Sequence, residues 1–278
     1  MKKKSQGYLG FKMKDDFSAL ERMEYSGRGI TIGATPKNDI FVVYTLTGRG
    51  DSSKARKLKE GSTTHIVSTE VTNEEQIKKG NQALLIYPAI MPINNSLTVS
   101  NGAQTDLLYT QVKNNPTLRG AWKFIELAFK KQCWRYDSKT DTIMDITTYE
   151  PDSSTTPRIA AVVDGADNKN LTGALWIARN NKGEREVGEY MFLIKPGLGH
   201  LITTYKGDNE SPLLLPFVGN TLEVTVRSTN ATDLVDNAYK SIENHFGVAA
   251  AAVVMDREGK LDIAIINACD LNKNEQQD

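Results

Sequence analysis

The chain has 278 residues, of which 39% are hydrophobic and 24% are charged. This composition is typical of a globular protein with enough apolar side chains for a sizeable core. Lysine plus arginine and aspartate plus glutamate both number 34, so the formal net charge is zero. This balance gives no support for binding to nucleic acid or to a membrane surface. No apolar run is long enough to span a bilayer, and the basic start lacks the apolar segment of a signal peptide, so we expect a cytoplasmic protein.

Residues 1–24 are predicted to form a polar lead-in with a short helix around 17–23. Strands are predicted where apolar and β-branched residues run together between turn residues, over 29–35, 40–46, 63–68, 83–87 and 97–100. The turn residues Pro36–Asp39 join the first two strands into a hairpin. We expect a basic loop over 49–59 and a tight turn at Asn101-Gly102.

The second half of the chain is rich in predicted strands. They lie over 159–163, 174–178, 190–194, 201–205, 222–226, 248–255 and 261–267. The last two close the chain as a hairpin. A polar segment over 138–148 precedes these strands, and it is expected to be an insertion.

Two helices are predicted from apolar residues that recur every three or four positions. The first face consists of Leu118, Trp122, Ile125 and Phe129, with Pro116 just ahead of it. The second face consists of Leu234, Ala238, Ile242 and Phe246. Strand-rich halves with a few helices indicate an α+β layered fold. We expect one domain over residues 25–270, followed by a disordered tail over 271–278.

Two arginines flanked by glycines are the most informative feature of the sequence. Arg28 lies in Gly-Arg-Gly before the first strand, and Arg49 lies in Gly-Arg-Gly after the second. Glycine lets the backbone come close to a ligand, and the guanidinium fork binds phosphate or a carboxamide oxygen from two directions. Lys54 and Arg56 follow in the same loop. A solvated basic loop is the alternative, but the pattern favours an anionic small-molecule site at the strand ends.

Further candidate residues flank the later strands. Arg158 opens an apolar strand and could point from its end into a pocket. Glu150 in Glu-Pro-Asp152 is the best acid, because neighbouring arginines would keep it ionised and ready for proton transfer. An exposed acidic loop is an equally valid interpretation. Tyr87 could simply be a strand-end tyrosine, and Asn101 a turn residue.

Several other site types find no support in the sequence. There is no P-loop, no dinucleotide-binding fingerprint and no nucleophile elbow. The histidines His65, His200 and His245 lie in no ligand motif, so we expect no metal.

These pieces together resemble the archaeal-type IMP cyclohydrolase family. The matching blocks occur in order and are Tyr25–Ile30, Phe41–Arg49 with Arg56, Val99–Asp106, Thr156–Ile159 and Gly199–Gly207. The resemblance implies a four-layer αββα sandwich similar to that of the N-terminal-nucleophile hydrolases, without self-processing. It also implies closure of formamidoimidazole-carboxamide ribotide (FAICAR) to IMP in purine biosynthesis, without a metal or organic cofactor.

The resemblance also implies residue roles. The implied catalytic residues are Arg56, Tyr87 and Glu150. The implied substrate-binding residues are Arg28, Arg49, Asn101, Gly102, Asp106 and Arg158. The polar stretch over 136–148 leaves Asp152 as an alternative to Glu150. Two other functions stay open: a non-catalytic purine-nucleotide-binding relative, and an enzyme acting on another amide. A homo-oligomer is also left open.

Overall fold

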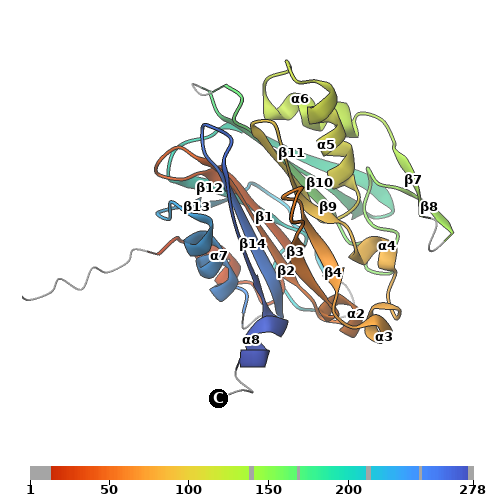
Figure 1. Ribbon diagram of the computed structural model, residues 1–278. Helices are drawn as coiled ribbons and strands as arrows, with labels where there is room; N and C mark the ends of the chain where they lie inside the picture. Colours follow the sequence, from red (N-terminus) through yellow and green to blue (C-terminus); the bar gives the residue numbers. More distant parts are fainter. Residues whose placement is uncertain (1–13, 138–140, 168–169, 211–213, 244–245, 275–278) are drawn as a thin grey trace, which may run out of the picture.

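The computed structural model describes residues 14–137, 141–167, 170–210, 214–243 and 246–274. Two large antiparallel sheets face each other, and helices lie on their outer faces (Figure 1). The six-stranded sheet has the order β13 (Leu222–Thr225), β12 (Leu198–Thr203), β1 (Arg28–Ala34), β2 (Ile40–Thr47), β14 (Gly247–Met255) and β15 (Leu261–Asn267).

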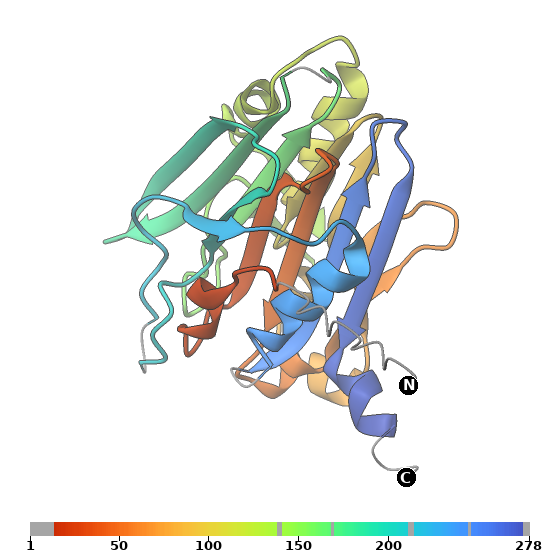
Figure 2. The ribbon, with the colours of Figure 1, turned by 90° about the vertical axis from the view of Figure 1, so that its left-hand side faces the viewer.

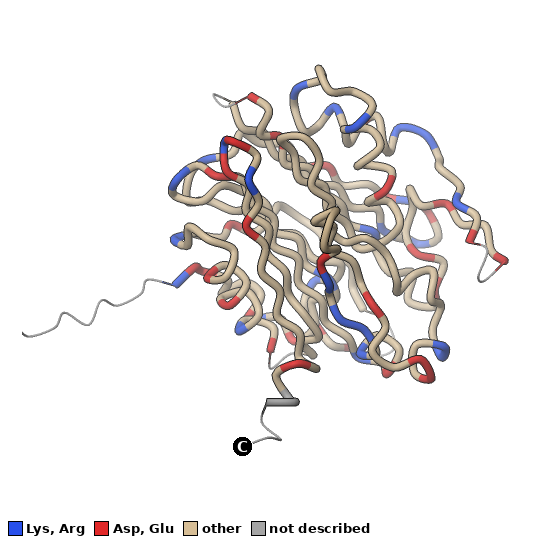
Figure 3. The backbone as a smooth tube through the Cα atoms, viewed as in Figure 1, with Lys and Arg blue, Asp and Glu red and all other residues tan. Residues whose placement is uncertain are grey.

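The seven-stranded sheet contains the remaining long strands. Its order is β11 (Glu184–Leu193), β10 (Thr172–Asn181), β9 (Arg158–Asp164), β6 (Ser96–Ser100), β5 (Pro88–Ile93), β4 (Val67–Val71) and β3 (Arg56–Glu60). Lysines and arginines follow one another along β3 (Figure 3), a pattern that discourages pairing of an edge strand with another chain.

The main core lies between the two sheets, and the alternation of side chains along each strand explains it. Along β2, Val42, Tyr44 and Leu46 point into this core, whereas Phe41 and Val43 point to the other face of the sheet. Both faces of β2 are buried, so its sequence is a continuous apolar run.

Helices cover the outer faces. Helix α7 (Ala231–Lys240) packs across the six-stranded sheet (Figure 2). The helices α5 (Gln104–Asn114) and α6 (Ala121–Phe129) cover the seven-stranded sheet. None of the described helices is long and apolar enough to cross a membrane. The molecule is therefore an α+β protein, as predicted.

The predicted lead-in packs onto the body of the protein. Its helix is α1 (Ser18–Glu21), and Phe17 and Leu20 are buried in the cluster beneath α7. The Asp15 carboxylate accepts hydrogen bonds from the backbone N–H groups of Arg227 and Ser228. Residues 1–13 lie outside the described part of the chain.

The predicted basic loop over 49–59 is wrong, because most of it is regular. Helix α2 (Asp51–Lys54) is followed at once by β3, in which Arg56 and Leu58 are buried and Lys59 is exposed. This inward-outward alternation is the signature of a half-buried strand.

The predicted strand over 83–87 is also wrong. Helix α4 (Gln82–Leu85) occupies most of it, because the Asn81 side chain caps the helix by accepting from the backbone N–H of Ala83. The strand predicted over 63–68 begins only at Val67, after a turn in which His65 has a positive φ of 54°.

Other elements were missed or misjudged in length. These are α3 (Glu74–Ile77), α5, the hairpin of β7 (Trp134–Asp137) with β8 (Thr142–Asp145), and α8 (Ala268–Asn274). The hairpin lies in the polar stretch, of which residues 138–140 are outside the described part. Helix α8 shows that residues 271–274 of the predicted tail are helical, whereas 275–278 are not described. Helix α7 ends at Lys240, so Ile242 and Phe246 of the predicted face lie beyond it.

Candidate active site

A cavity of about 420 Å³ opens at the end of the sandwich where β1 begins and β2 ends. Its lining comes from the start of β1, from the short helices α2 and α4, and from loops that join strands of the two sheets. It is formed by Tyr25, Arg28, Arg49, Gly50, Ser52, Ser53, Gly80, Asn81, Leu84, Leu85, Glu150, Asp152, Ser153, Ser154, Thr156, Tyr205 and Leu214. Small-molecule sites typically have volumes of roughly 300–1,000 Å³, so this cavity fits a nucleotide-sized ligand.

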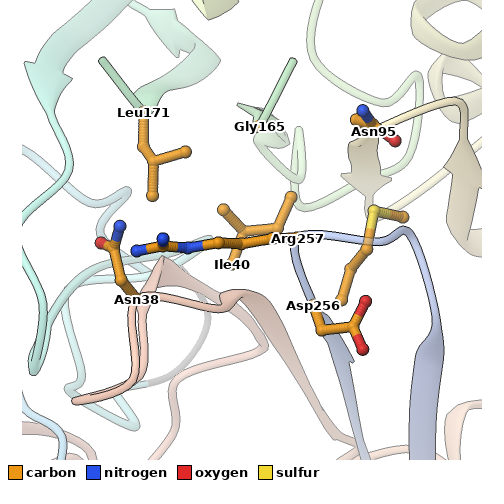
Figure 4. A pocket seen from close by; sticks show the side chains of 8 residues that line it. Asn38, Ile40, Asn95, Gly165, Leu171, Asp256 and Arg257 are labelled. Carbon is orange, nitrogen blue, oxygen red and sulfur yellow. The ribbon is translucent and has the colours of Figure 1, made fainter. Parts of the chain in front are cut away.

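A second cavity lies at the opposite end, between the turns that contain Asn38, Asn95 and Arg257 (Figure 4). Its volume is about 10 Å³, which leaves room for a water molecule at most. This second cavity is therefore too small for a substrate.

A buried ion pair forms one wall of the larger cavity. The Nη2 of Arg28 donates to Oε1 of Glu150 at 2.7 Å, and both side chains are nearly inaccessible to solvent. Arg28 belongs to the six-stranded sheet, whereas Glu150 lies in the loop before β9 of the other sheet. Gly27, with φ 70°, lets the backbone before Arg28 pack closely against Thr204 and Tyr205, because a Cβ there would lie against the Thr204 hydroxyl and 2.7 Å from the Tyr205 ring.

Burial and charge act in opposite directions on this carboxylate. Burial raises the pKa of Glu150 above its ordinary value, although the charges of Arg28 and Arg158 lower it. The sequence predicted that these cations would hold Glu150 ionised, and the structure adds burial as the larger effect. A carboxylate with a raised pKa is a stronger base than an exposed one, which suits proton transfer near neutral pH.

The other carboxylate of this loop, Asp152, is occupied by hydrogen bonds. It accepts from the backbone N–H of Thr156 at 2.7 Å and from the Thr156 hydroxyl at 2.6 Å. Since the Thr156 hydroxyl donates its proton to the carboxylate, the Tyr205 hydroxyl, 2.8 Å away, must donate to Thr156. Burial raises the pKa of Tyr205 to about 12, so it stays protonated. Asp152 thus orients Tyr205.

Cations and aromatic rings surround the mouth of the cavity. The Arg49 guanidinium lies over the Tyr25 ring, 5.0 Å from its centroid, and donates to the Asn209 side chain at 3.2 Å. Tyr25 in turn stacks on Tyr205, with ring centroids 5.6 Å apart. Together with the hydroxyl groups of the α2 segment, this arrangement suits a phosphate group.

A second layer of buried polar groups lies behind the cavity wall. The hydroxyls of Tyr44 and Tyr87 are 2.8 Å apart. Arg56 is buried and donates to the backbone carbonyls of Ser53 and Leu85, two residues that line the cavity. Arg56 therefore holds the α2 and α4 segments together and does not line the cavity itself.

Arg158 is held at the start of β9 by a network around Asn101. The Asn101 side chain accepts from the backbone N–H of Ile159 at 2.8 Å and donates to the carbonyl of Pro157 at 2.9 Å. Gln104 donates to Asn101 and accepts from Arg158 Nη1 at 3.1 Å. Glycine at position 102 leaves room for this network, because a Cβ would lie 2.6 Å from the Arg158 guanidinium.

Two of these arginines keep a buried donor without a partner. The Nε atoms of Arg28 and Arg158 make no hydrogen bond within the described residues. The Nε of Arg179 on β10 has no partner either, but of these three arginines it is Arg28 that lines the cavity, so its Nε is a donor available to an oxygen-bearing ligand. Among the described residues, no group of three His, Cys, Asp or Glu side chains could hold a metal ion, and His245 lies outside them.

Comparison with known proteins identifies the family. Residues 25–260 match the model of the IMP cyclohydrolase-like protein family. The chain belongs to this family. It is 22% identical to the IMP cyclohydrolase of Methanocaldococcus jannaschii over 235 residues, which cover 84% of this chain and 96% of that protein. It is 24% identical to the IMP cyclohydrolase of Methanococcus aeolicus over 182 residues, which cover 66% and 74% of the two chains.

The IMP cyclohydrolase-like fold brings most of the predicted residues to one end. Arg28, Arg49 and Glu150 line the cavity, and the remaining predicted residues near it are Arg56, Tyr87, Asn101, Gly102 and Arg158. Asp106 is different: it lies half-exposed on α5 and forms an ion pair with Arg135 at 2.7 Å, outside the cavity.

Sequence reasoning missed four residues of this site. They are Tyr44, Gln104, Thr156 as a hydrogen-bonding residue, and Tyr205. Tyr44 was missed because it lies in an apolar strand, where a tyrosine is usually interpreted as a core residue. All four residues lie inside the matching blocks, so those blocks were the available signal.

Proposed function

We propose that this protein is an IMP cyclohydrolase that closes FAICAR to IMP with loss of water. The observation that carries the proposal is the buried Glu150–Arg28 pair on the wall of a nucleotide-sized cavity. The family match and the names of the relatives support the same reaction.

The proposed substrate position follows from the charges around the cavity. The 5′-phosphate would bind at the mouth, beside Arg49 and the hydroxyls of Ser52 and Ser53. The imidazole with its two side groups would then extend inward to Arg28 and Glu150. Because both reacting groups belong to one molecule, holding them close together supplies much of the rate.

The chemistry requires removal of two protons and one oxygen. The carboxamide nitrogen attacks the formyl carbon, and a new carbon–nitrogen bond forms. The formyl oxygen then leaves as water, with one proton from the carboxamide nitrogen and one from the formamide nitrogen. Glu150 is the proposed base for the carboxamide proton. Arg28, whose Nε donor has no partner within the described residues, would stabilise the charge that develops on the formyl oxygen, and Arg158 would add positive charge nearby.

The same proposal includes the finer fold assignment. The order of helix, sheet, sheet and helix supports the αββα sandwich of the N-terminal-nucleophile hydrolases. Since the cavity is lined by loops that join strands of both sheets, residues 25–270 would act as one domain. The proposed partner is a purine ribonucleotide in the cytoplasm, with no nucleic acid or membrane, and a homo-oligomer remains open.

The test is the absorbance of FAICAR mixed with a catalytic amount of the purified protein. Ring closure changes the chromophore, and an enzyme converts many equivalents. A nucleotide-binding relative without the proton-transfer residues would give at most one equivalent of change. Turnover of another formamido or amide substrate, but not of FAICAR, would indicate the related hydrolase instead.

A further inference from the structure

Tyr44 and Tyr87 connect the two sheets directly behind the proposed site. Tyr44 points inward from the middle of β2, and Tyr87 immediately precedes β5 of the other sheet. Their hydroxyl groups are 2.8 Å apart, and both side chains belong to the core cluster between the sheets. Packing alone does not explain two phenol hydroxyls that face each other in a hydrophobic core. Phenylalanine rings would fill the same space without the free-energy cost of burying polar groups.

The two hydroxyls carry two protons, and the hydrogen bond between them uses one. Within the described part of the chain, neither hydroxyl has another hydrogen-bonding partner. Arg28 and Arg56 are close enough to influence Tyr44 electrostatically. A guanidinium group only donates, so neither arginine can accept the second phenolic proton. One tyrosine of the pair therefore has a proton to offer to a ligand.

The position of each ring decides which tyrosine this is. Tyr44 is fully enclosed, with 0% of its surface exposed, and burial raises its pKa well above the ordinary value, so it keeps its proton. Tyr87 is 3% exposed and lies directly behind the cavity lining, since it follows Leu84 and Leu85, which line the cavity. Both tyrosines act electrostatically on Arg28, and Tyr87 acts on Arg158 as well.

We propose that Tyr44 is a positioning residue whose hydroxyl donates to the oxygen of Tyr87, so that the Tyr87 proton is directed at the departing formyl oxygen. This inference rests on the proposed function and deepens it. Tyr44 does not touch the substrate; it fixes the direction of the Tyr87 O–H bond. It also stabilises the negative charge that Tyr87 gains as its proton moves to the leaving oxygen. The oxygen leaves as water with this proton and with the carboxamide proton that Glu150 took up, and the proton lost by the formamide nitrogen returns to Tyr87.

The experiment is a double-mutant cycle on kcat and KM for FAICAR closure, using Tyr44→Phe, Tyr87→Phe and the double variant. Loss of a positioned proton donor in Tyr87→Phe should lower kcat by ~10²–10⁴-fold. Tyr44→Phe should lower kcat about 10-fold with KM changed less than about twofold, because the substrate-binding groups are intact. The double variant should be no slower than Tyr87→Phe, since Tyr44 acts only through Tyr87.

Tyr239→Phe provides the matched control. Tyr239 is also buried, but it lies on α7 in the outer cluster beyond the six-stranded sheet. The Tyr239→Phe variant should leave kcat unchanged. This result would separate the loss of any buried hydroxyl from the loss of the Tyr44–Tyr87 hydrogen bond. Two outcomes would overturn the role of Tyr44 without touching the proposed function, provided that the unchanged protein turns over. One is a double variant in which the two losses of kcat add up, and the other is a wild-type kcat in Tyr44→Phe. No turnover by the unchanged protein would overturn the proposed function, and this role with it.

Discussion

Arg28 and Glu150 are 122 residues apart in the chain, yet their side chains meet at 2.7 Å across the gap between two sheets. Neither belongs to the apolar core, and both are almost completely buried. A buried ion pair is weak evidence for stability, because removing two charges from water costs about as much as their attraction returns. The position of this ion pair on the wall of the cavity therefore indicates a chemical role.

The sharpest prediction concerns Glu150→Gln. Glutamine keeps the shape of the side chain and still accepts the hydrogen bond from Arg28, but it cannot take a proton. We expect kcat to fall by ~10²–10⁴-fold while the affinity for IMP changes little. Steady-state kinetics and calorimetry measure the two quantities.

Asp152→Asn is the matched control for this variant. Asp152 accepts two hydrogen bonds from Thr156 and thereby orients Tyr205, so its loss should disturb the site without removing the base. We expect a much milder loss of kcat. If Asp152→Asn were the more damaging change, the role of base would belong to Asp152.

The pH dependence of turnover should report the burial of Glu150. Burial raises the pKa of this carboxyl, and a protonated carboxyl cannot accept the substrate proton. Turnover should therefore be full above the Glu150 pKa and fall as the pH is lowered through it. The midpoint of this acid limb should lie above the ordinary glutamate value of about 4.3. The limb should be absent from the residual activity of Glu150→Gln, and an unchanged limb in that variant would assign it to another group.

Arg49→Ala should weaken IMP binding. A charge-assisted hydrogen bond to phosphate is worth about 1.5–3 kcal/mol, which corresponds to roughly 10–150-fold in affinity. Binding by the unchanged protein should weaken with added salt, and the variant should depend on salt less steeply. Calorimetric titration at two salt concentrations measures both effects. Lys240→Ala on α7 is the control, because Lys240 pairs with Asp236 away from the cavity. Equal IMP affinity in Arg49→Ala and the unchanged protein would place the phosphate elsewhere.

Turnover should not depend on a metal ion. The proposed steps use only proton transfer and the fixed charges of arginine side chains. Prolonged dialysis against a chelator, followed by assay in metal-free buffer, should leave kcat unchanged. Activity that disappears on chelation and returns with zinc would contradict the proposed mechanism.

Much of this protein could be predicted from local sequence. Continuous apolar runs such as Ile40–Leu46 predict buried strands, because side chains alternate and both faces of the sheet are covered. The glycines around Arg28 also indicated a close approach of backbone, which Gly27 shows by its positive φ. These signals depend on neighbouring residues in the sequence, so they can be recognised without the tertiary structure. The predicted roles of individual residues came from the sequence blocks that resemble the family.

Short elements and partnerships were decided only by the tertiary structure. Residues 83–87 suit a strand by composition, but Asn81 caps a helix there, and Leu84 and Leu85 face the cavity. No local pattern reveals that Tyr44 meets Tyr87, or that Asp106 pairs with Arg135 away from the site. The first pair depends on how the two large sheets stack, and the second on how the β7–β8 hairpin lies against α5. The sequence thus determined which residues could take part in catalysis or binding. The tertiary structure decided which of them lie close together.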